Sequence, residues 1–501
     1  MRKLILLRRV SQAFFLLLFI YILWSTTYPL TGMFPPETFF TTNPSIMVFT
    51  SISERIVLPG LIFAAIMLVL TLILGRVYCG WICPLGTMID LTGSLKKSKI
   101  IPGNSANKKI RKIKFFILGV IFVSALAGIQ VAWVLDPMGI VARFVSLNLI
   151  PTVTLLFDKI FIVLIRNFEM YGKVYDVYRD LRASFLGIQV HYFASSMIIF
   201  AVFAIVCAFA LFVSRLWCRS LCPLGAFYSL VARFSLMRRV VYKCISCGVC
   251  TPACRMGAIT GGTEYEKGEC ILCMDCVYVC PVNATQFSFP KPGIKKQLEK
   301  ETDTSRKNFI ILLLSSLFLM GSKKKKGKGG ESLVIRPPAA LKEKDFYDRC
   351  IRCGNCMKVC PTNGLQPVML QAGLESIWTP HLVPEIGYCE YQCTLCGNVC
   401  PTGAIPKISK DKKMKTKLGT AKVERSKCLA WEHKLECLVC EEHCPIAEKA
   451  IKVVEETFEG KTIKKPVVDP NLCVGCGICQ TKCPVRPVRA IRVTPKNADR
   501  T

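Results

Sequence analysis

Two stretches with the same cysteine spacing decide the fold of this chain: Cys244-Ile-Ser-Cys247-Gly-Val-Cys250-Thr-Pro-Ala-Cys254 and Cys270-Ile-Leu-Cys273-Met-Asp-Cys276-Val-Tyr-Val-Cys280. Both read C-x2-C-x2-C-x3-C, in which three close thiolates bind one 4Fe-4S cubane and the distant fourth reaches a second cubane. We therefore expect cluster A on Cys244, Cys247, Cys250 and Cys280, and cluster B on Cys270, Cys273, Cys276 and Cys254. Structural zinc takes two C-x2-C pairs and has no use for a third cysteine with a trailing Cys-Pro, so zinc is disfavoured.

The C-terminal region holds 16 more cysteines in four related groups. They are Cys350, Cys353, Cys356 and Cys360; Cys389, Cys393, Cys396 and Cys400; Cys428, Cys437, Cys440 and Cys444; and Cys473, Cys476, Cys479 and Cys483. The 24 ligands predict six 4Fe-4S clusters, and they leave five of the 29 cysteines for other roles. Because metal ligation replaces much of the apolar core in small units, we expect small α+β bacterial-ferredoxin-like domains, at 240–290 with two clusters and at 341–495 with four.

A second cysteine motif occurs twice in the N-terminal half. The segment Arg76-Val-Tyr-Cys79-Gly-Trp-Ile-Cys83-Pro84-Leu-Gly86 recurs as Arg215-Leu-Trp-Cys218-Arg-Ser-Leu-Cys222-Pro223-Leu-Gly225. The recurrence predicts a duplicated two-helix unit, in which the i, i+4 spacing puts both sulfurs on one helix face and Pro-Leu-Gly bends the chain away. Cys79, Cys83, Cys218 and Cys222 are expected to form a redox relay, either one further cluster or two reversible dithiols. Buried inert thiols are the alternative, and this is the interpretation for the unmatched Cys207.

Four apolar stretches, at 10–30, 56–74, 115–135 and 193–213, have about the 20 residues that cross a bilayer. Hydrophobic residues make up 52% of the chain and the mean hydropathy is +0.40, so we expect an α-helical membrane domain of four to five spans at 1–239. Nine Lys and Arg residues in the 76–114 loop place that loop and the N-terminus in the cytoplasm. The 136–192 loop is then external, and its interrupted apolar stretch at 150–165 is expected as an interfacial or re-entrant helix.

Residues 291–340 are expected as a charged linker with a short apolar anchor, Phe309 to Met320. The preceding Thr304-Ser305-Arg306-Lys307-Asn308-Phe309 is similar to a degenerate twin-arginine export signal, which would carry the following domain across the membrane already folded. The run from Lys323 to Lys326 opposes export, because lysines just past an apolar stretch belong inside. We expect a multi-pass protein of a bacterial or archaeal cytoplasmic membrane. Its first ferredoxin domain is then cytoplasmic, and its C-terminal ferredoxin domain is exported and extracytoplasmic.

Membrane lipid, the quinone pool and a redox protein are the expected partners. A quinone exchanges protons as well as electrons, so its site needs an ionisable group near the bilayer surface. His191 starts the fourth apolar stretch and Asp136 ends the third, which makes them a candidate quinone site, with interfacial capping and snorkelling as the alternative. The formal charge of +32 falls to about +20 once six clusters add about −2 each, so nucleic acid is not an expected partner.

Taken together, these motifs resemble a fusion of two electron-transfer families. Residues 1–290 are similar to the NapH type, a membrane polyferredoxin with paired Cys-x3-Cys-Pro motifs and a two-cluster ferredoxin. Residues 305–495 are similar to the NapG/MauM type of exported four-cluster ferredoxin. The matching stretches there are Arg336-Pro-Pro-Ala-Ala-Leu, Asp348-Arg-Cys350-Ile-Arg-Cys353, Cys400-Pro-Thr-Gly-Ala-Ile405 and Val474-Gly-Cys476-Gly.

The resemblance implies a quinol dehydrogenase component that relays electrons to an extracytoplasmic redox partner, such as a cytochrome or a reductase subunit. It also implies that, in the C-terminal domain, the first motif pairs with the fourth and the second with the third. On that pairing, Cys483 would complete the cluster of Cys350, Cys353 and Cys356.

Two other functions remain open from the sequence. The chain could be an assembly factor that reduces or metallates a respiratory metalloenzyme, although this leaves the four extra clusters unexplained. Alternatively, the C-terminal ferredoxin stays cytoplasmic and the chain links a soluble ferredoxin or dehydrogenase to the quinone pool, which the lysine run favours. Each cluster group has four cysteines and leaves no iron open for bond chemistry, so we expect electron conduction rather than a stand-alone enzyme.

Overall fold

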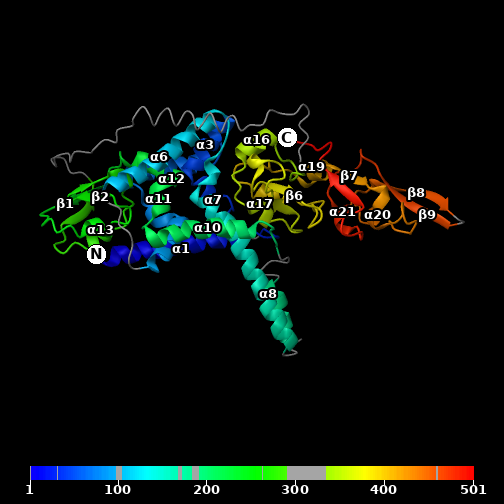
Figure 1. Cartoon of the computed structure of the whole chain (residues 1–501), viewed down its shortest axis with the longest axis horizontal. Helices are drawn as coiled ribbons and strands as arrows, with labels where there is room; N and C mark the ends of the chain where they lie inside the picture. Colours follow the sequence, from blue (N-terminus) through cyan, green and yellow to red (C-terminus); the bar gives the residue numbers. More distant parts are fainter. Residues whose placement is uncertain are drawn as a thin grey trace. The chain divides into compact units, whose positions relative to one another are not determined.

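The computed structural model describes residues 2–30, 32–96, 104–167, 172–182, 191–261, 263–289, 334–458 and 461–501. The chain divides into two compact units (Figure 1). The first unit contains Met1–Ile22, Glu37–Phe144 and Ile198–Lys324, and the second contains Leu23–Pro36, Val145–Met197 and Lys325–Thr501. Each unit therefore joins one cysteine-rich domain to segments of the N-terminal half. The predicted apolar anchor, the export-like segment and the lysine run lie outside the described residues.

The first unit is built from helices followed by the two-cluster domain. Its helical part consists of α1 (Arg2–Trp24), α2 (Thr38–Thr41), α3 (Pro44–Glu54), α4 (Leu61–Leu74), η1 (Tyr78–Ile82), α5 (Pro84–Ser94), α6 (Asn104–Leu126), η2 (Ala132–Val134), α7 (Pro137–Phe144), α10 (Ser196–Phe212), α11 (Leu216–Ser220) and α12 (Pro223–Ala232). The cluster domain adds β1 (Arg238–Val241), α13 (Cys250–Ala253), β2 (Ile259–Gly261), β3 (Glu264–Tyr265), η5 (Lys267–Glu269), α14 (Asp275–Tyr278) and β4 (Thr285–Ser288).

The second unit combines a few helices with the four-cluster domain. The helices are η3 (Val145–Leu149), α8 (Ile150–Asn167) and α9 (Lys173–Leu181). The cluster domain contains α16 (Glu343–Arg349), α17 (Asn355–Lys358), β5 (Leu365–Pro367), η6 (Leu374–Ser376), β6 (Pro380–Leu382), α18 (Leu395–Asn398), α19 (Lys410–Lys415), β7 (Thr420–Val423), η7 (Arg425–Lys427), α20 (Val439–Glu442), β8 (Ile451–Phe458), β9 (Lys461–Val468), α21 (Ile478–Lys482) and β10 (Ile491–Thr494).

Helices form at each of the four predicted apolar stretches, but their lengths do not confirm four spans. Within the described residues, two helical segments are long and apolar enough to cross a membrane, Lys3–Trp24 and Pro137–Asn167. The apolar helices α4 and α10 have only 14 and 17 residues, which is short of the roughly 20 that a bilayer requires. The stretch at 150–165, expected as an interfacial or re-entrant helix, lies within the 31-residue helical segment that ends at Asn167.

The Cys-Pro step starts a new helix in both repeats. Pro84 and Pro223 are the first residues of α5 and α12, where the missing N–H of proline costs no hydrogen bond. Cys83 and Cys222 are therefore the extended N-cap residues of these helices and do not continue the helices that hold Cys79 and Cys218. The predicted placement of each sulfur pair on one helix face is wrong, because the chain turns between the second cysteine and the proline.

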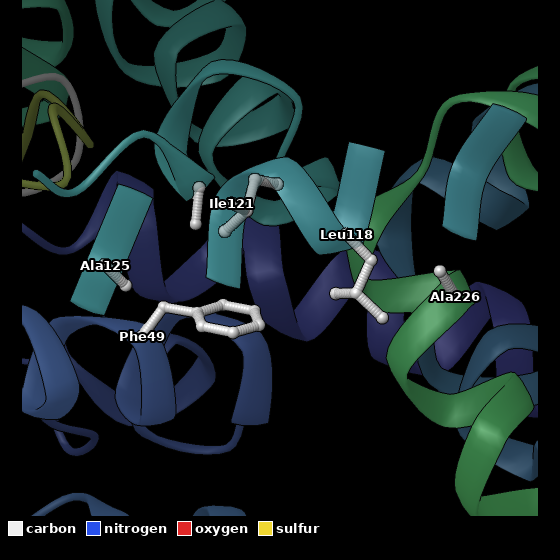
Figure 2. Close-up of a cluster of buried hydrophobic side chains, with 6 residues drawn as sticks. Phe49, Leu118, Ile121, Ala125 and Ala226 are labelled. Carbon is white, nitrogen blue, oxygen red and sulfur yellow. The ribbon is translucent and has the colours of Figure 1, made fainter. Parts of the chain in front are cut away.

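A small apolar core joins α3, α6 and α12 of the first unit. Figure 2 shows Phe49 of α3 beside Ile121 and Ala125 of α6, with Leu118 closer to Ala226 of α12. All of these side chains are less than 10% exposed. The core therefore ties the helix that follows the second Cys-Pro step to two helices from the first half of the unit.

The cluster domains have the short α+β pieces that their size predicts. Within the described residues, the strands pair as five antiparallel two-stranded sheets, β1–β4, β2–β3, β5–β6, β7–β10 and β8–β9. The one-turn helices lie within the cysteine motifs, and α17 and α21 begin after Gly354 and Gly477, whose φ angles are +91° and +85°. Glycine suits this left-handed position, which turns the backbone around the cysteine sulfurs.

Replacing Phe346 by alanine should destabilise the C-terminal domain by about 3–5 kcal/mol, because the buried ring would leave a cavity. Phe346 is 0% exposed, and its ring centroid lies 4.8 Å from the guanidinium of Arg336. The measurement is the urea midpoint at which the visible absorption of the clusters is lost from the full chain. Leu374→Ala, at a side chain that is 73% exposed, is the control and should stay within about 0.5 kcal/mol. Equal midpoints for both variants would contradict the packing assigned to Phe346.

Candidate iron-sulfur centres

Two cavities in the second unit are each lined by four cysteines. Centre 2 is lined by Cys360, Cys389, Cys393 and Cys396, and centre 3 by Cys428, Cys437, Cys440 and Cys483. Leucine, valine, isoleucine and proline side chains form most of the remaining walls. Four thiols around an apolar cavity fit a 4Fe-4S cubane. Among the described residues, no three His, Cys, Asp or Glu side chains are placed to hold a single metal ion.

The other eight cysteines of this domain form two similar groups. Centre 1 consists of Cys350, Cys353, Cys356 and Cys400, and centre 4 of Cys473, Cys476, Cys479 and Cys444, as the electrostatic interactions among their sulfurs indicate. Burial raises the pKa of Cys353 and of Cys476 to about 12. Their thiolate forms, which bind iron, are therefore stable only when a cation replaces the proton.

The cluster pairing implied by the resemblance is wrong. Cys483 lines the cavity of centre 3, and the fourth sulfur near Cys350, Cys353 and Cys356 belongs to Cys400. Motifs therefore exchange their fourth cysteines in the order first with second and third with fourth. The physical reason is that the one-turn helices pack in consecutive pairs, α17 with α18 and α20 with α21, so each fourth cysteine reaches the neighbouring motif.

The four centres of this domain form a continuous row. Cys356 of centre 1 lies within electrostatic range of Cys396 of centre 2. The backbone N–H of Cys389 in centre 2 donates to the carbonyl of Cys476 in centre 4, with an N···O distance of 2.8 Å. Cys479 of centre 4 lies in turn within electrostatic range of Cys440 of centre 3. The spatial order is therefore centres 1, 2, 4 and 3, with direct contact between the ligand loops of centres 2 and 4.

In the first unit, the structure supports the predicted ligands of cluster B. Cys254 interacts electrostatically with Cys270, Cys273 and Cys276, and burial raises the pKa of Cys270 to about 12. For cluster A, Cys244 and Cys247 are exposed, and Arg239 Nη2 lies 3.7 Å from the sulfur of Cys250. Completion of cluster A by Cys280 stays a prediction.

Backbone amides donate hydrogen bonds to several ligand sulfurs. These bonds run from Ala258 to Cys254 (3.2 Å), from Ala284 to Cys280 (3.2 Å), from Ala421 to Cys473 (3.4 Å) and from Ile405 to Cys400 (3.5 Å). Hydrogen bonds to sulfur disperse its negative charge and are one of the factors that set the reduction potential of an iron-sulfur cluster.

The two Cys-x3-Cys-Pro motifs bring their four sulfurs together. Each of Cys79, Cys83, Cys218 and Cys222 interacts electrostatically with the other three, and all but Cys79 are buried. We call this group the four-cysteine centre. The convergence of both repeats on one site agrees with the expected relay, while the choice between a cluster and two dithiols stays open.

The two residues predicted to bind a quinone lie in different units. Asp136 is fully buried in the first unit, where it accepts hydrogen bonds from Asn43 Nδ2 (2.6 Å) and from the backbone N–H of Gly139 (2.7 Å). His191 lies in the second unit, where its Nε2 is 2.9 Å from the carbonyl oxygen of Cys360, a ligand of centre 2. Asp136 therefore accepts a hydrogen bond from the first turn of α7, and His191 contacts the backbone of a cluster-ligand loop.

Three buried cations in the cysteine motifs were given no role from the sequence. Arg76 and Arg215 open the two Cys-x3-Cys-Pro motifs, and Lys358 lies between two cysteines of the first C-terminal motif. Arg215 is only 1% exposed. The signal that could have found the arginines is their identical place in the repeat.

Comparison with protein families supports these sites. A family described as a 4Fe-4S binding domain matches residues 56–102 and 195–242, which contain the two halves of the four-cysteine centre. Another of the same description matches residues 242–257, and a 4Fe-4S dicluster domain matches 269–364 and 434–486. No solved structure matches the chain.

Relatives with electron-transfer names are similar to the chain. The methylamine utilization ferredoxin-type protein MauM of Methylorubrum extorquens is 36% identical over 174 residues, which are 33% of this chain and 74% of the relative. The ferredoxin-type protein NapG of Escherichia coli is 35% identical over 170 residues, 32% of this chain and 70% of the relative. YccM of Escherichia coli, named provisionally as an electron transport protein, is 27% identical over 258 residues, 48% of this chain and 60% of the relative.

The pairing of the C-terminal motifs can be tested with single and double cysteine variants. Cys350→Ser and Cys400→Ser both act on centre 1, so each should lower the iron content by about four per chain, and the double variant by no more. Cys350→Ser combined with Cys483→Ser acts on two centres and should remove about eight. Iron per chain is the measurement. The reverse pattern, additive for the first pair and not for the second, would restore the pairing of the first motif with the fourth.

Proposed function

Because the chain belongs, through its C-terminal domain, to the family of MauM and NapG ferredoxin-type proteins, we propose that it is a membrane-bound carrier that takes electrons from quinol and passes them to an extracytoplasmic redox partner. The observation that carries this proposal is the row of centres 1, 2, 4 and 3, in which neighbouring ligand loops touch or interact. A cubane, when bound, carries one electron and breaks no substrate bond. Sixteen cysteines arranged in this way suit conduction better than assembly of another enzyme.

An extracytoplasmic place for the C-terminal domain is supported by the loops that it contacts. Lys358 Nζ donates to the carbonyls of Trp24 (3.1 Å) and Thr26 (2.9 Å), near the end of the first apolar stretch that leads into the 31–55 loop. Asn363 and Gln366 both donate to the carbonyl of Tyr192, at 3.0 Å. The positive-inside rule places both of these segments outside the cytoplasm.

A cytoplasmic place for the two-cluster domain is supported in the same way. Lys114 Nζ bonds to both carboxylate oxygens of Glu269, and Arg111 forms an ion pair with Glu266. Both cations come from the basic 76–114 loop, which the positive-inside rule places in the cytoplasm. This agrees with the expected topology, in which the first ferredoxin domain is cytoplasmic.

Contact with lipid is supported by the apolar surfaces of the two shorter helices. Ile62 and Ile66 of α4 are 69% and 58% exposed, and Met197 and Ile205 of α10 are 75% and 55% exposed. Side chains of this kind exposed along a whole helix would be costly in water and are ordinary in a bilayer. We therefore infer a multi-pass membrane protein, with α4 and α10 as additional membrane helices.

A quinol site beside the second unit is the simplest entry point on this view. His191 is the candidate for quinol contact, because its ring hydrogen-bonds to the backbone of a centre 2 ligand. An electron that leaves quinol there enters the row of centres without crossing the hydrocarbon. Asp136, which is buried and already hydrogen-bonded, is the weaker candidate.

The side of the membrane can be tested by labelling introduced cysteines from outside intact cells. Lys412→Cys in the C-terminal domain should gain label over the parent chain, because its side chain is exposed and we place this domain outside. Glu264→Cys, exposed in the two-cluster domain, is the matched control and should gain label only after lysis. If Lys412→Cys also needs lysis, the domain is cytoplasmic, and the chain instead links a cytoplasmic donor to the quinone pool.

Electron donation can be tested with the purified full chain under anaerobic conditions. A quinol should bleach the visible absorption of the clusters, which an assembly factor with no quinol site would not show. Iron should reach about 28 per chain if the four-cysteine centre holds a seventh cubane and about 24 if it works as two dithiols. A preparation with its full iron content that no quinol reduces would contradict the proposed function.

A further inference from the structure

The four-cysteine centre lies directly against the loop that holds cluster B. Trp81, within the first Cys-x3-Cys-Pro motif, donates from Nε1 to the carbonyl oxygen of Leu272 at 3.0 Å. Gly80 packs so closely on the same loop that a Cβ there would lie 2.2 Å from the carbonyl oxygen of Ile271. Because Ile271 and Leu272 lie between two ligands of cluster B, the ligand loops of the two centres are in van der Waals contact.

Arg76 connects the two centres through its guanidinium. The side chain is 0% exposed, and its Nη1 donates to Glu269 Oε2 at 3.0 Å. Glu269 is the residue immediately before Cys270, a ligand of cluster B. Its charge acts on Cys270 and, in the four-cysteine centre, on Cys222. The Nε and Nη2 atoms have no hydrogen-bond partner, and a Cβ on Gly225 would lie 3.1 Å from Nη2. The free edge of the guanidinium therefore faces the four-cysteine centre.

Arg215 makes the equivalent connection from the second repeat. It is 1% exposed, and its Nη1 donates to the carbonyl oxygen of Cys79 at 2.8 Å. Its Nε and Nη2 bind the carboxylate of Asp90 at 2.8 Å and 2.6 Å. Its charge acts on Cys218 of the four-cysteine centre and on Cys273 of cluster B. Both arginines thus act on one sulfur or more of each centre.

The two arginines cross between the repeats. Arg76 from the first repeat approaches Gly225 of the second, and Arg215 from the second repeat lies 3.4 Å from the carbonyl oxygen of Gly86 in the first. Arg215 therefore donates a hydrogen bond to the Pro-Leu-Gly segment of the opposite motif, and Arg76 packs against Gly225 of the other. This exchange is a structural reason for arginine at the first position of both repeats.

The ion networks around these arginines, buried in the first case and partly exposed at Arg255 in the second, carry excess positive charge. One network joins Arg76 and Lys114 to Glu269, and the other joins Arg8, Arg215 and Arg255 to Asp90 and Asp275. In the described part of the chain, each network has one more cation than it has carboxylates. An unbalanced buried charge is costly, so a negative group is needed beside it. A cubane with four thiolates supplies about −2.

We propose that Arg76 and Arg215 are positioning residues that hold the four-cysteine centre against cluster B and raise the reduction potentials of both. The inference rests on the proposed function as an electron carrier, and it takes the four-cysteine centre to hold a cubane rather than two dithiols. Cubanes bound by these cysteines would exchange one electron, without forming or breaking a bond and without moving a proton. A nearby cation favours the reduced, more negative form of each cubane, so it raises the potential of both.

The experiment is a mediated redox titration of the full-length protein, followed by EPR. In Arg76→Gln, the potentials of cluster B and of the four-cysteine centre should both become more negative, because a positive charge has been lost. Arg76→Lys keeps the charge and should keep both potentials nearer to those of the wild-type protein. The signal of cluster B is the one that disappears in Cys273→Ser.

Glu269→Gln separates an electrostatic role from a structural one. Loss of its negative charge should move both potentials in the positive direction, opposite to Arg76→Gln, whereas damaged packing has no reason to reverse sign. Arg143→Gln is the control, because Arg143 is 2% exposed in the same unit and its guanidinium lies over Trp133. It should leave both potentials unchanged.

Potentials that are equal in the wild-type protein, Arg76→Gln and Glu269→Gln would overturn the inference, as would shifts of the same sign in the two variants. The mediators set the potential, so the titration does not depend on quinol. A wild-type protein that quinol cannot reduce would therefore contradict the proposed function alone. A wild-type titration without a signal from the four-cysteine centre would reject its cubane, and the inference with it.

Discussion

The structure depends on one requirement, that four cysteine sulfurs surround each small apolar cavity. The C-terminal domain meets it with pieces as short as one helical turn and strands of three or four residues, because ligation rather than a large core fixes the loops. The long β8–β9 hairpin is the exception, and it carries no cluster ligand. Helices and strands are therefore short in the segments whose cysteine side chains must point into a cluster cavity, and they are longer in segments without cluster ligands.

The exchange of fourth cysteines between consecutive motifs follows from the same requirement. A sulfur that leaves its own motif must find three others within reach, and the packed pair of one-turn helices supplies them. Once centres 1 and 2 form one such pair and centres 3 and 4 another, only the contact between Cys389 and Cys476 is needed to join the pairs into a row. Four similar motifs thereby form a linear series of centres, with centre 1 at one end and centre 3 at the other.

In the first unit, buried ion pairs surround the cysteine sites, whereas in the second unit mainly apolar side chains line the two cysteine cavities. Arg76, Lys114 and Glu269 are completely or almost completely buried, which is costly wherever a charge is left without a partner. The two cations come from the helical part of the unit and share the carboxylate of Glu269 in the cluster domain, so the ion network also fastens these two parts to each other. The side chains that fasten the two parts together are thus also the ones that we propose to act on the four-cysteine centre and cluster B.

The amino-acid sequence by itself predicted that cysteines bind 4Fe-4S clusters and located the repeated motif, because ligand spacing and chain order are local properties. It also placed helices at the four apolar stretches, since hydropathy is local too. Only the tertiary structure decided that Cys400 and not Cys483 joins Cys350, that Cys83 and Cys222 sit at helix starts, and that Arg215 is buried. These outcomes depend on which distant segments pack together, and sequence spacing carries no information about that choice when several motifs are chemically alike.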